Sequence, residues 1–131
     1  MGRRRKKKEL QSPEDFEQVL GEEISVSTEF DLPLSVLAAL AEDGWTPGAT
    51  RRALDVLRTA DLVTQPEPAE IAIALPNTVA RDARALERRL REAVPEAKVG
   101  ITAHRMGDTV TDLLERARAV AEGRSSSRGP S

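Results

Sequence analysis

Apolar and polar residues follow two different periods along this chain, and together they predict a mixture of helices and strands. Apolar residues repeat every three to four positions in segments that predict helices at about 13–20, 33–43, 47–60, 78–93 and 108–121. Alternating or β-branched apolar residues predict strands at 24–28, 62–64, 70–75 and 97–103. The predicted fold class is therefore α+β, with helix as the majority state.

The apolar positions of these segments also predict the core. The residues expected to be buried are Leu37, Leu40, Val56, Leu57, Leu86, Leu90, Leu113 and Leu114.

The order of the elements predicts one domain over residues 12–122. Residues 12–75 contain a helix, a strand, two helices and a hairpin, because a Pro-rich turn separates the strands at 62–64 and 70–75. This order is winged-helix-like. It continues into a C-terminal αβα part, residues 76–122, whose strand can pair in parallel with 70–75 through a right-handed crossover. The alternative is a winged-helix unit followed by a separate C-terminal dimerisation unit.

Two short helices joined by a tight turn are predicted between Leu32 and Thr64. Pro33 and Pro47 suit the first turn of a helix, and Thr46 can cap the second one. Gly44 suits the residue just past the end of the first helix.

This pair of helices resembles a known DNA-binding unit. The segment GATRRALDVLRTADLVTQ, residues 48–65, resembles the recognition helix and exit strand of winged helix-turn-helix regulators of the GntR and MarR type. The preceding LAALAEDGWTP resembles the helix and turn before them. The resemblance implies a winged-helix fold and a role in transcription regulation. Asp61 departs from the family pattern, which has glycine there.

Charge is strongly segregated along the chain, although the formal net charge is only -2. Residues 3–8 carry six positive charges, whereas residues 9–43 carry ten acidic residues and no basic one. Residues 1–11 are therefore predicted to be a disordered basic arm that binds a polyanion, solubilises the chain or folds back on the acidic segment. Residues 123–131, GRSSSRGPS, are predicted to be a disordered tail.

Few residues offer chemistry of their own. The chain has no cysteine, so disulfides and thiolate metal sites are excluded, and no nucleotide-loop or metalloprotease motif occurs. His104 is the only histidine, and an exposed loop position is its expected role. We therefore predict no enzyme, no catalytic residue, no metal and no cofactor. No apolar run is long enough for a membrane span, so we expect a cytoplasmic protein.

The leading hypothesis is a small non-enzymatic DNA-binding regulator, with a homodimer as a possible form. Arginine reads guanine edges and threonine contacts phosphate, so the second helix of the pair supplies the groove-facing residues and the arm binds phosphates. The residues predicted to bind DNA are Arg3, Arg4, Arg5, Lys6, Lys7, Lys8, Thr50, Arg51 and Arg52. The alternative is a bacterial or phage protein–protein adaptor or assembly module without nucleic-acid binding, because the acidic body repels DNA.

Overall fold

The protein is an α+β sandwich of helices around one sheet, which confirms the predicted fold class. A computed structural model describes residues 7–123, so the predicted arm residues 1–6 and most of the predicted tail lie outside the described residues. The elements of the described part are α1 (Pro13–Phe30), β1 (Leu34–Leu40), α2 (Pro47–Val56), β2 (Leu62–Glu67), β3 (Glu70–Pro76), α3 (Ala80–Ala93), β4 (Lys98–Ala103) and α4 (Val110–Ala121). None of the described helices is long and apolar enough to cross a membrane.

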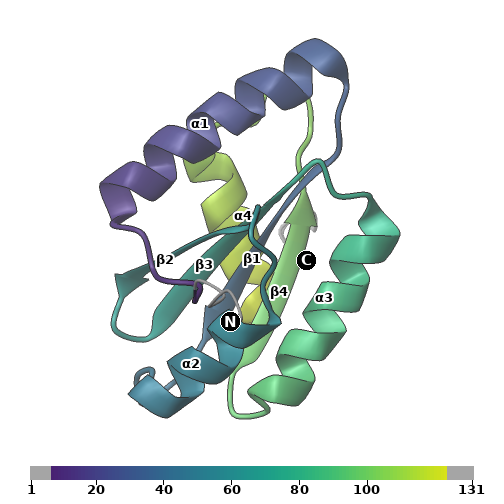
Figure 1. Ribbon diagram of the computed structural model, residues 1–131. Coiled ribbons are helices and arrows are strands. Elements are labelled where there is room, and N and C mark those ends of the chain that lie inside the picture. Colours follow the sequence, from purple (N-terminus) through teal and green to yellow (C-terminus); the bar gives the residue numbers. More distant parts are fainter. Residues whose placement is uncertain (1–6, 124–131) are drawn as a thin grey trace, which may run out of the picture.

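The four strands form one antiparallel sheet in the order β2-β3-β1-β4. β1 lies in the middle, where Leu37 pairs with Ile73 on one side and with Ile101 on the other. Helices α1 and α4 cover one face of the sheet, and α2 and α3 cover the other (Figure 1). Because both faces are covered, the inner strands are buried on both sides.

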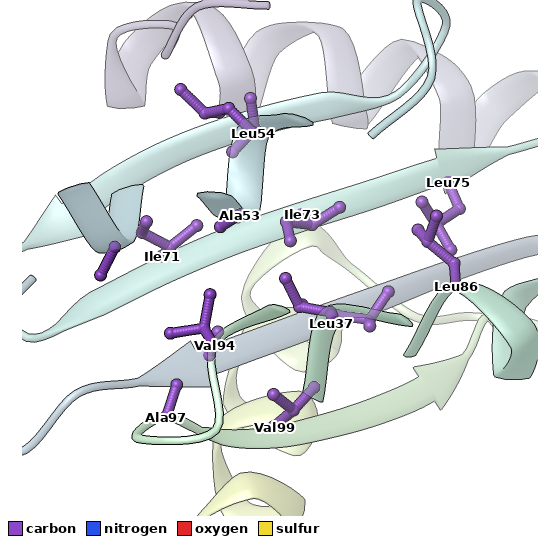
Figure 2. Close-up of a cluster of buried hydrophobic side chains, with 14 of the residues drawn as sticks. Leu37, Ala53, Leu54, Ile71, Ile73, Leu75, Leu86, Val94, Ala97 and Val99 are labelled. Carbon is purple, nitrogen blue, oxygen red and sulfur yellow. The ribbon is translucent and has the colours of Figure 1, made fainter. Parts of the chain in front are cut away.

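Two hydrophobic clusters result, one on each face. The cluster under α2 and α3 contains large aliphatic side chains, among them Leu37, Ile73, Leu75 and Leu86 (Figure 2). The cluster under α1 and α4 combines Phe16, Leu20 and Leu113 with alanines of both the sheet and α4. Because these side chains are small, the backbone of α4 can lie close to the backbone of the sheet.

The predicted helix at 33–43 is wrong, because residues 34–40 form the central strand β1. Its apolar positions Val36, Leu37 and Leu40 match helical spacing by chance. A strand buried on both faces loses the alternation that identifies a half-exposed strand, and Leu34 to Ala39 are all buried. The predicted helix-turn-helix therefore does not exist in this protein.

The predicted strand at 24–28 is also wrong, because α1 continues through Gly21 to Phe30. The predicted Ser12 cap is confirmed, since its side chain accepts a hydrogen bond from the Asp15 backbone N–H (3.1 Å). Burial of Phe16 and Leu20 at helical spacing outweighs the local strand preference of the Ile-Ser-Val-Ser segment.

The second half of the chain was predicted more accurately. The β2–β3 hairpin and the elements α3, β4 and α4 are confirmed within a few residues, although α2 ends at Val56 rather than near residue 60. Parallel pairing is wrong, because β1 lies between β3 and β4. Of the predicted core, Leu37, Leu86, Leu90 and Leu113 are buried, whereas Leu40, Val56, Leu57 and Leu114 are only partly buried.

Candidate functional site

The N-terminal segment, residues 7–11, lies against the edge strand β2. Gln11 forms a parallel bridge with Thr64, and its backbone N–H donates to the Val63 carbonyl (2.8 Å). The side-chain oxygen of Gln11 also accepts a hydrogen bond from the Val63 backbone N–H (3.1 Å). These bonds hold Lys7 and Lys8 beside the turn that joins α2 to β2.

That turn is closed by an ion pair between Arg58 and Asp61. Asp61 accepts from the Arg58 backbone N–H (2.7 Å) and from its guanidinium Nη2 (2.9 Å). The same Nη2 donates to Thr78 Oγ1 (2.6 Å), which joins the turn to the segment before α3. The Asp61 side chain is fully buried, whereas the Arg58 side chain is 47% exposed. A buried carboxylate thus fixes a guanidinium that still faces solvent.

A groove of about 1140 Å³ lies between the N-terminal segment, the α2–β2 turn and α3. We call it the basic groove. Its charged lining residues are the cations Lys7, Lys8, Arg58 and Arg89 and the carboxylates Glu9, Asp55 and Asp61. Asp61 is paired with Arg58, and Asp55 with Arg51 outside the lining. Within the described residues Lys7 and Arg89 have no carboxylate partner, so the groove offers cations to a ligand.

The pKa values of two cations in the basic groove are shifted in opposite directions. Burial lowers the pKa of the Lys8 ammonium, and the nearby Asp61 carboxylate only partly opposes this effect. The hydrogen bond to Asp61 raises the pKa of Arg58 above its usual value. Lys8 Nζ donates only to the Thr59 carbonyl (2.8 Å) among the described residues, so an anion in the groove would stabilise its charged form.

The predicted DNA-binding residues do not form one surface. Arg51 pairs with Asp55 and donates from Nη2 to the Lys8 carbonyl (2.8 Å), so it supports the wall of the groove. Arg52 lies on the α3 side, where it donates to the Ala93 carbonyl (2.9 Å) and pairs with Glu96 (2.6 Å). Thr50 is half-buried on α2, and of the six arm cations predicted to bind DNA only Lys7 and Lys8 lie inside the described residues. A ligand-binding role for these residues stays a prediction.

An acidic pocket of about 600 Å³ lies at the other end of the hairpin. Its base is Glu70, whose side chain is 5% exposed and accepts from Arg118 Nε (3.0 Å). The remaining charged lining residues are Glu42, Glu67, Glu96, Lys98 and Glu122. Over residues 7–123, no group of three or more histidine or carboxylate side chains is arranged to hold a metal ion.

Sequence reasoning missed Arg58, Asp61 and Arg89 as possible ligand residues. Arg58 and Asp61 stand three positions apart where α2 ends and β2 begins, which is a signal that the sequence contains. In the sequence Asp61 is notable only as a departure from the winged-helix pattern, and Arg89 is one of several arginines in the helix predicted at 78–93. Only the tertiary fold shows that these residues meet the N-terminal segment.

Comparison with known proteins identifies the fold. No protein-family model and no curated protein matches the chain. Among solved structures, the diguanylate cyclase SiaD from Pseudomonas aeruginosa, in complex with its activator SiaC, has a TM-score of 0.76 and 23% identity; the match covers 87% of this chain and 54% of that chain. This chain thus spans about half of that structure.

Two further structures match over most of their own length. The active GGEEF domain of a diguanylate cyclase from Vibrio cholerae has a TM-score of 0.76 and 13% identity, with 88% of this chain and 90% of that chain covered. The GGDEF domain of DgcB from Caulobacter crescentus, in complex with c-di-GMP, has a TM-score of 0.72 and 15% identity, with 94% and 89% covered. The sequences GGDEF and GGEEF are absent here, because the chain contains no two adjacent glycines.

These similarities overturn the regulator hypothesis. The winged-helix resemblance and the DNA-binding function are wrong, because the matching folds are diguanylate cyclase domains. The prediction that the chain is no enzyme is contradicted by the same matches, and the adaptor alternative gains no advantage from them. At 13–23% identity the likeness establishes the architecture: this chain has the fold of GGDEF diguanylate cyclase domains.

Proposed function

We propose that this protein binds a cyclic guanine dinucleotide, cyclic-di-GMP, in the basic groove. The proposal rests on one observation. This chain shares its fold with a domain solved in complex with c-di-GMP, and its groove is lined by cations of which Lys7 and Arg89 have no carboxylate partner among the described residues. A cytoplasmic setting remains part of the proposal.

The charges of the groove suit the phosphates of such a ligand. Cyclic-di-GMP carries two phosphate groups, and Lys7, Lys8 and Arg89 are available to form charge-assisted hydrogen bonds with them. Lys8 is partly desolvated already, so pairing with a phosphate restores a favourable environment for its charge.

The guanine bases suit the fixed guanidinium of Arg58. Asp61 and Thr78 engage the Nε and Nη2 donors of Arg58, so Nη1 is the donor left for guanine O6 or N7, and the exposed guanidinium plane can also stack on the base. Asp61 and Thr78 already hold the Arg58 side chain in place, so less conformational entropy is lost when a base binds. Glu9 and Asp55 line the same groove and can accept from the N–H groups of guanine.

The test is calorimetric titration of the full chain with cyclic-di-GMP, with GTP and cyclic-di-AMP as competitors. We expect saturable binding that favours the guanine dinucleotide and weakens as salt increases. The double variant Lys7→Ala/Arg89→Ala should bind at least about a hundredfold more weakly, because it loses two charge-assisted bonds that each contribute roughly 1.5–3 kcal/mol. These two side chains pair with no carboxylate in the described part of the chain, so the fold should tolerate their loss.

Arg105→Ala is the matched control, because Arg105 is an exposed cation outside the groove. Its affinity should equal that of wild type. Absence of cyclic-di-GMP binding, or equal affinity for the double variant and wild type, would disprove the proposal.

A second candidate function is the enzymatic conversion of a nucleotide in the acidic pocket. It is favoured by the buried Glu70 carboxylate, which stands beside the cations Arg118 and Lys98 in a pocket of about 600 Å³. Incubation with GTP followed by chromatography tests it. Product formation that Glu70→Gln abolishes and Lys7→Ala/Arg89→Ala preserves would assign the reaction to this pocket.

A further inference from the structure

Helix α1 presents an acidic face to solvent. Asp15, Glu22 and Glu29 are seven residues apart and all exposed, on the side of the helix opposite the buried Phe16 and Leu20. None of the three acids has an ion-pair partner among the described residues. Since residues 9–43 contain no basic side chain, nothing on this helix neutralises the face.

Helix α3 presents the opposite charge. Arg81, Arg84 and Arg88 lie on the outer side of the helix, opposite the buried Leu86 and Leu90, and all three are exposed. In residues 7–123 these arginines form no ion pair, whereas Arg91 on the same helix pairs with Glu87. The outer face of α3 is therefore a predominantly basic stripe, with the exposed Glu92 one turn after Arg88.

The acidic face of α1 and the basic face of α3 carry opposite charges at the same spacing. Residues seven apart on a helix are separated by about 10.5 Å along the axis, so Glu22 and Glu29 have the same spacing as Arg81 and Arg88. An antiparallel arrangement places Glu29 at Arg81 and Glu22 at Arg88, and it also aligns the two helix dipoles favourably. We propose that the occupant of each face is a second copy of this chain, with α1 of one copy docked antiparallel on α3 of the next.

The position of the two helices determines the kind of assembly. α1 and α3 lie on opposite sides of the sheet, so a copy that uses its α1 still exposes its α3 (Figure 1). Such a contact is heterologous and extends into chains or rings rather than closing as a two-fold dimer. Exposed ion pairs contribute little individually, so the association should be weak and sensitive to salt.

This proposal is independent of nucleotide binding. Arg81, Arg84 and Arg88 do not line the basic groove, and the acids of α1 line neither the groove nor the acidic pocket. The two proposals can therefore fail separately.

Sedimentation velocity of the full chain gives the first test. At about 20 mM salt the sedimentation coefficient should rise with protein concentration, and at about 300 mM it should return to the monomer value. The triple variant Arg81→Glu/Arg84→Glu/Arg88→Glu should remain monomeric at low salt, whereas the control Arg105→Glu should behave as wild type. A monomeric wild type, or association that survives in the triple variant, overturns the proposal.

Cross-linking gives a second test that depends on geometry and leaves every charge in place. The chain has no cysteine, so single cysteines can be placed at Ser25, between Glu22 and Glu29, and at Ala85, between Arg81 and Arg88. Under mild oxidation, a mixture of Ser25→Cys and Ala85→Cys should cross-link several times faster than either variant alone. A mixture of Ser25→Cys with Thr111→Cys, an exposed position on α4, is the control. Equal rates for the two mixtures overturn the proposal.

Discussion

The two faces of the sheet are packed in different ways. Under α2 and α3 the contacts are made by large branched side chains, including Leu37, Ile71 and Ile73. Under α4 the sheet offers small residues, and Gly100 of β4 lies directly beneath the helix backbone. A methyl group on Gly100 would come within 2.6 Å of the Ala117 carbonyl oxygen and even closer to the Ala121 nitrogen. The face under α2 and α3 is therefore stabilised by large side chains that fill the space, whereas the close packing of α4 requires small residues in the sheet.

This difference means that similar substitutions should have opposite effects on the two faces. A larger side chain should destabilise the protein most under α4, because the helix backbone cannot move aside. A smaller side chain should destabilise it most under α3, because truncating a branched side chain leaves a cavity.

Gly100→Ala should have the largest effect of the changes considered. The new methyl group meets helix backbone rather than a flexible side chain, so we expect a loss of about 3 kcal/mol or more in unfolding free energy. Gly48→Ala on α2 is the matched control, because no atom lies within 4 Å of the position its Cβ would take. Urea denaturation should show this control to be neutral or slightly stabilised. Equal stability for the two variants would contradict the close approach of α4.

Leu90→Ala should have the next largest effect, on the opposite face. Leu90 is fully buried in the α3 cluster, and truncation leaves a cavity that costs about 3 kcal/mol. Thermal or urea unfolding measures the loss. A change below about 0.5 kcal/mol would show that this face is less tightly packed than its side chains indicate.

Arg116→Ala tests the polar link between α4 and the end of β4. Arg116 donates to Asp108 Oδ2 (2.6 Å) and to Thr102 Oγ1 (2.7 Å), and the Asp108 side chain is only 11% exposed. We expect a loss of about 2 kcal/mol near neutral pH. Arg91→Ala is the counterpart on α3; its side chain is half exposed, so its loss should be about 1 kcal/mol or less.

The Arg116→Ala effect should also depend on pH. The hydrogen bonds from Arg116 lower the pKa of Asp108, so the folded state favours the ionised carboxylate. The resulting stability is complete above the ordinary aspartate pKa of about 3.9 and is lost as pH falls through the lower folded-state pKa. The difference in unfolding free energy between wild type and Arg116→Ala should therefore shrink below about pH 4. A difference that stays constant down to about pH 2 would contradict the pair.

The smallest effects should come from the helix caps of the two faces. Thr109 caps α4 in a reciprocal capping box with Asp112, whereas Thr46 caps α2 with a single bond to the Ala49 N–H (3.1 Å). Each Thr→Ala change removes one hydrogen bond and should cost about 1 kcal/mol, with Thr109→Ala the smaller loss because the Asp112 carboxylate still accepts from the backbone N–H of residue 109. Circular dichroism melts of both variants test this order; a larger loss for Thr109→Ala would contradict it.

An element with one exposed face shows its period in the sequence, and β3, although buried on both faces, was predicted because its large and small residues alternate. α3 alternates buried leucines with exposed arginines, so its pattern is visible in the sequence. β1 is buried on both faces, and its LSVLAAL segment is equally compatible with a helix. The strand-like residues after Gly21 were misread for a different reason. The helix there is held by packing against the sheet, which a local pattern does not contain.

The candidate site was less predictable than the fold. The basic arm identified Lys7 and Lys8, but its meeting with Arg58 depends on the bridge between Gln11 and Thr64. Arg89 joins them only because α3 packs beside α2. These contacts connect residues far apart in the chain, so no local spacing could reveal them.

The central position of β1 also determines the order in which the chain can fold. Leu34 pairs with Pro76 and Ser35 with Ala103, so the first strand to leave the ribosome obtains its second partner only when most of the chain exists. The β2–β3 hairpin, by contrast, is local and can form early. Non-local pairing of this kind slows folding, and an unpaired apolar strand is prone to aggregate meanwhile. Nascent chains that stop before β4 should therefore be the species that chaperones bind.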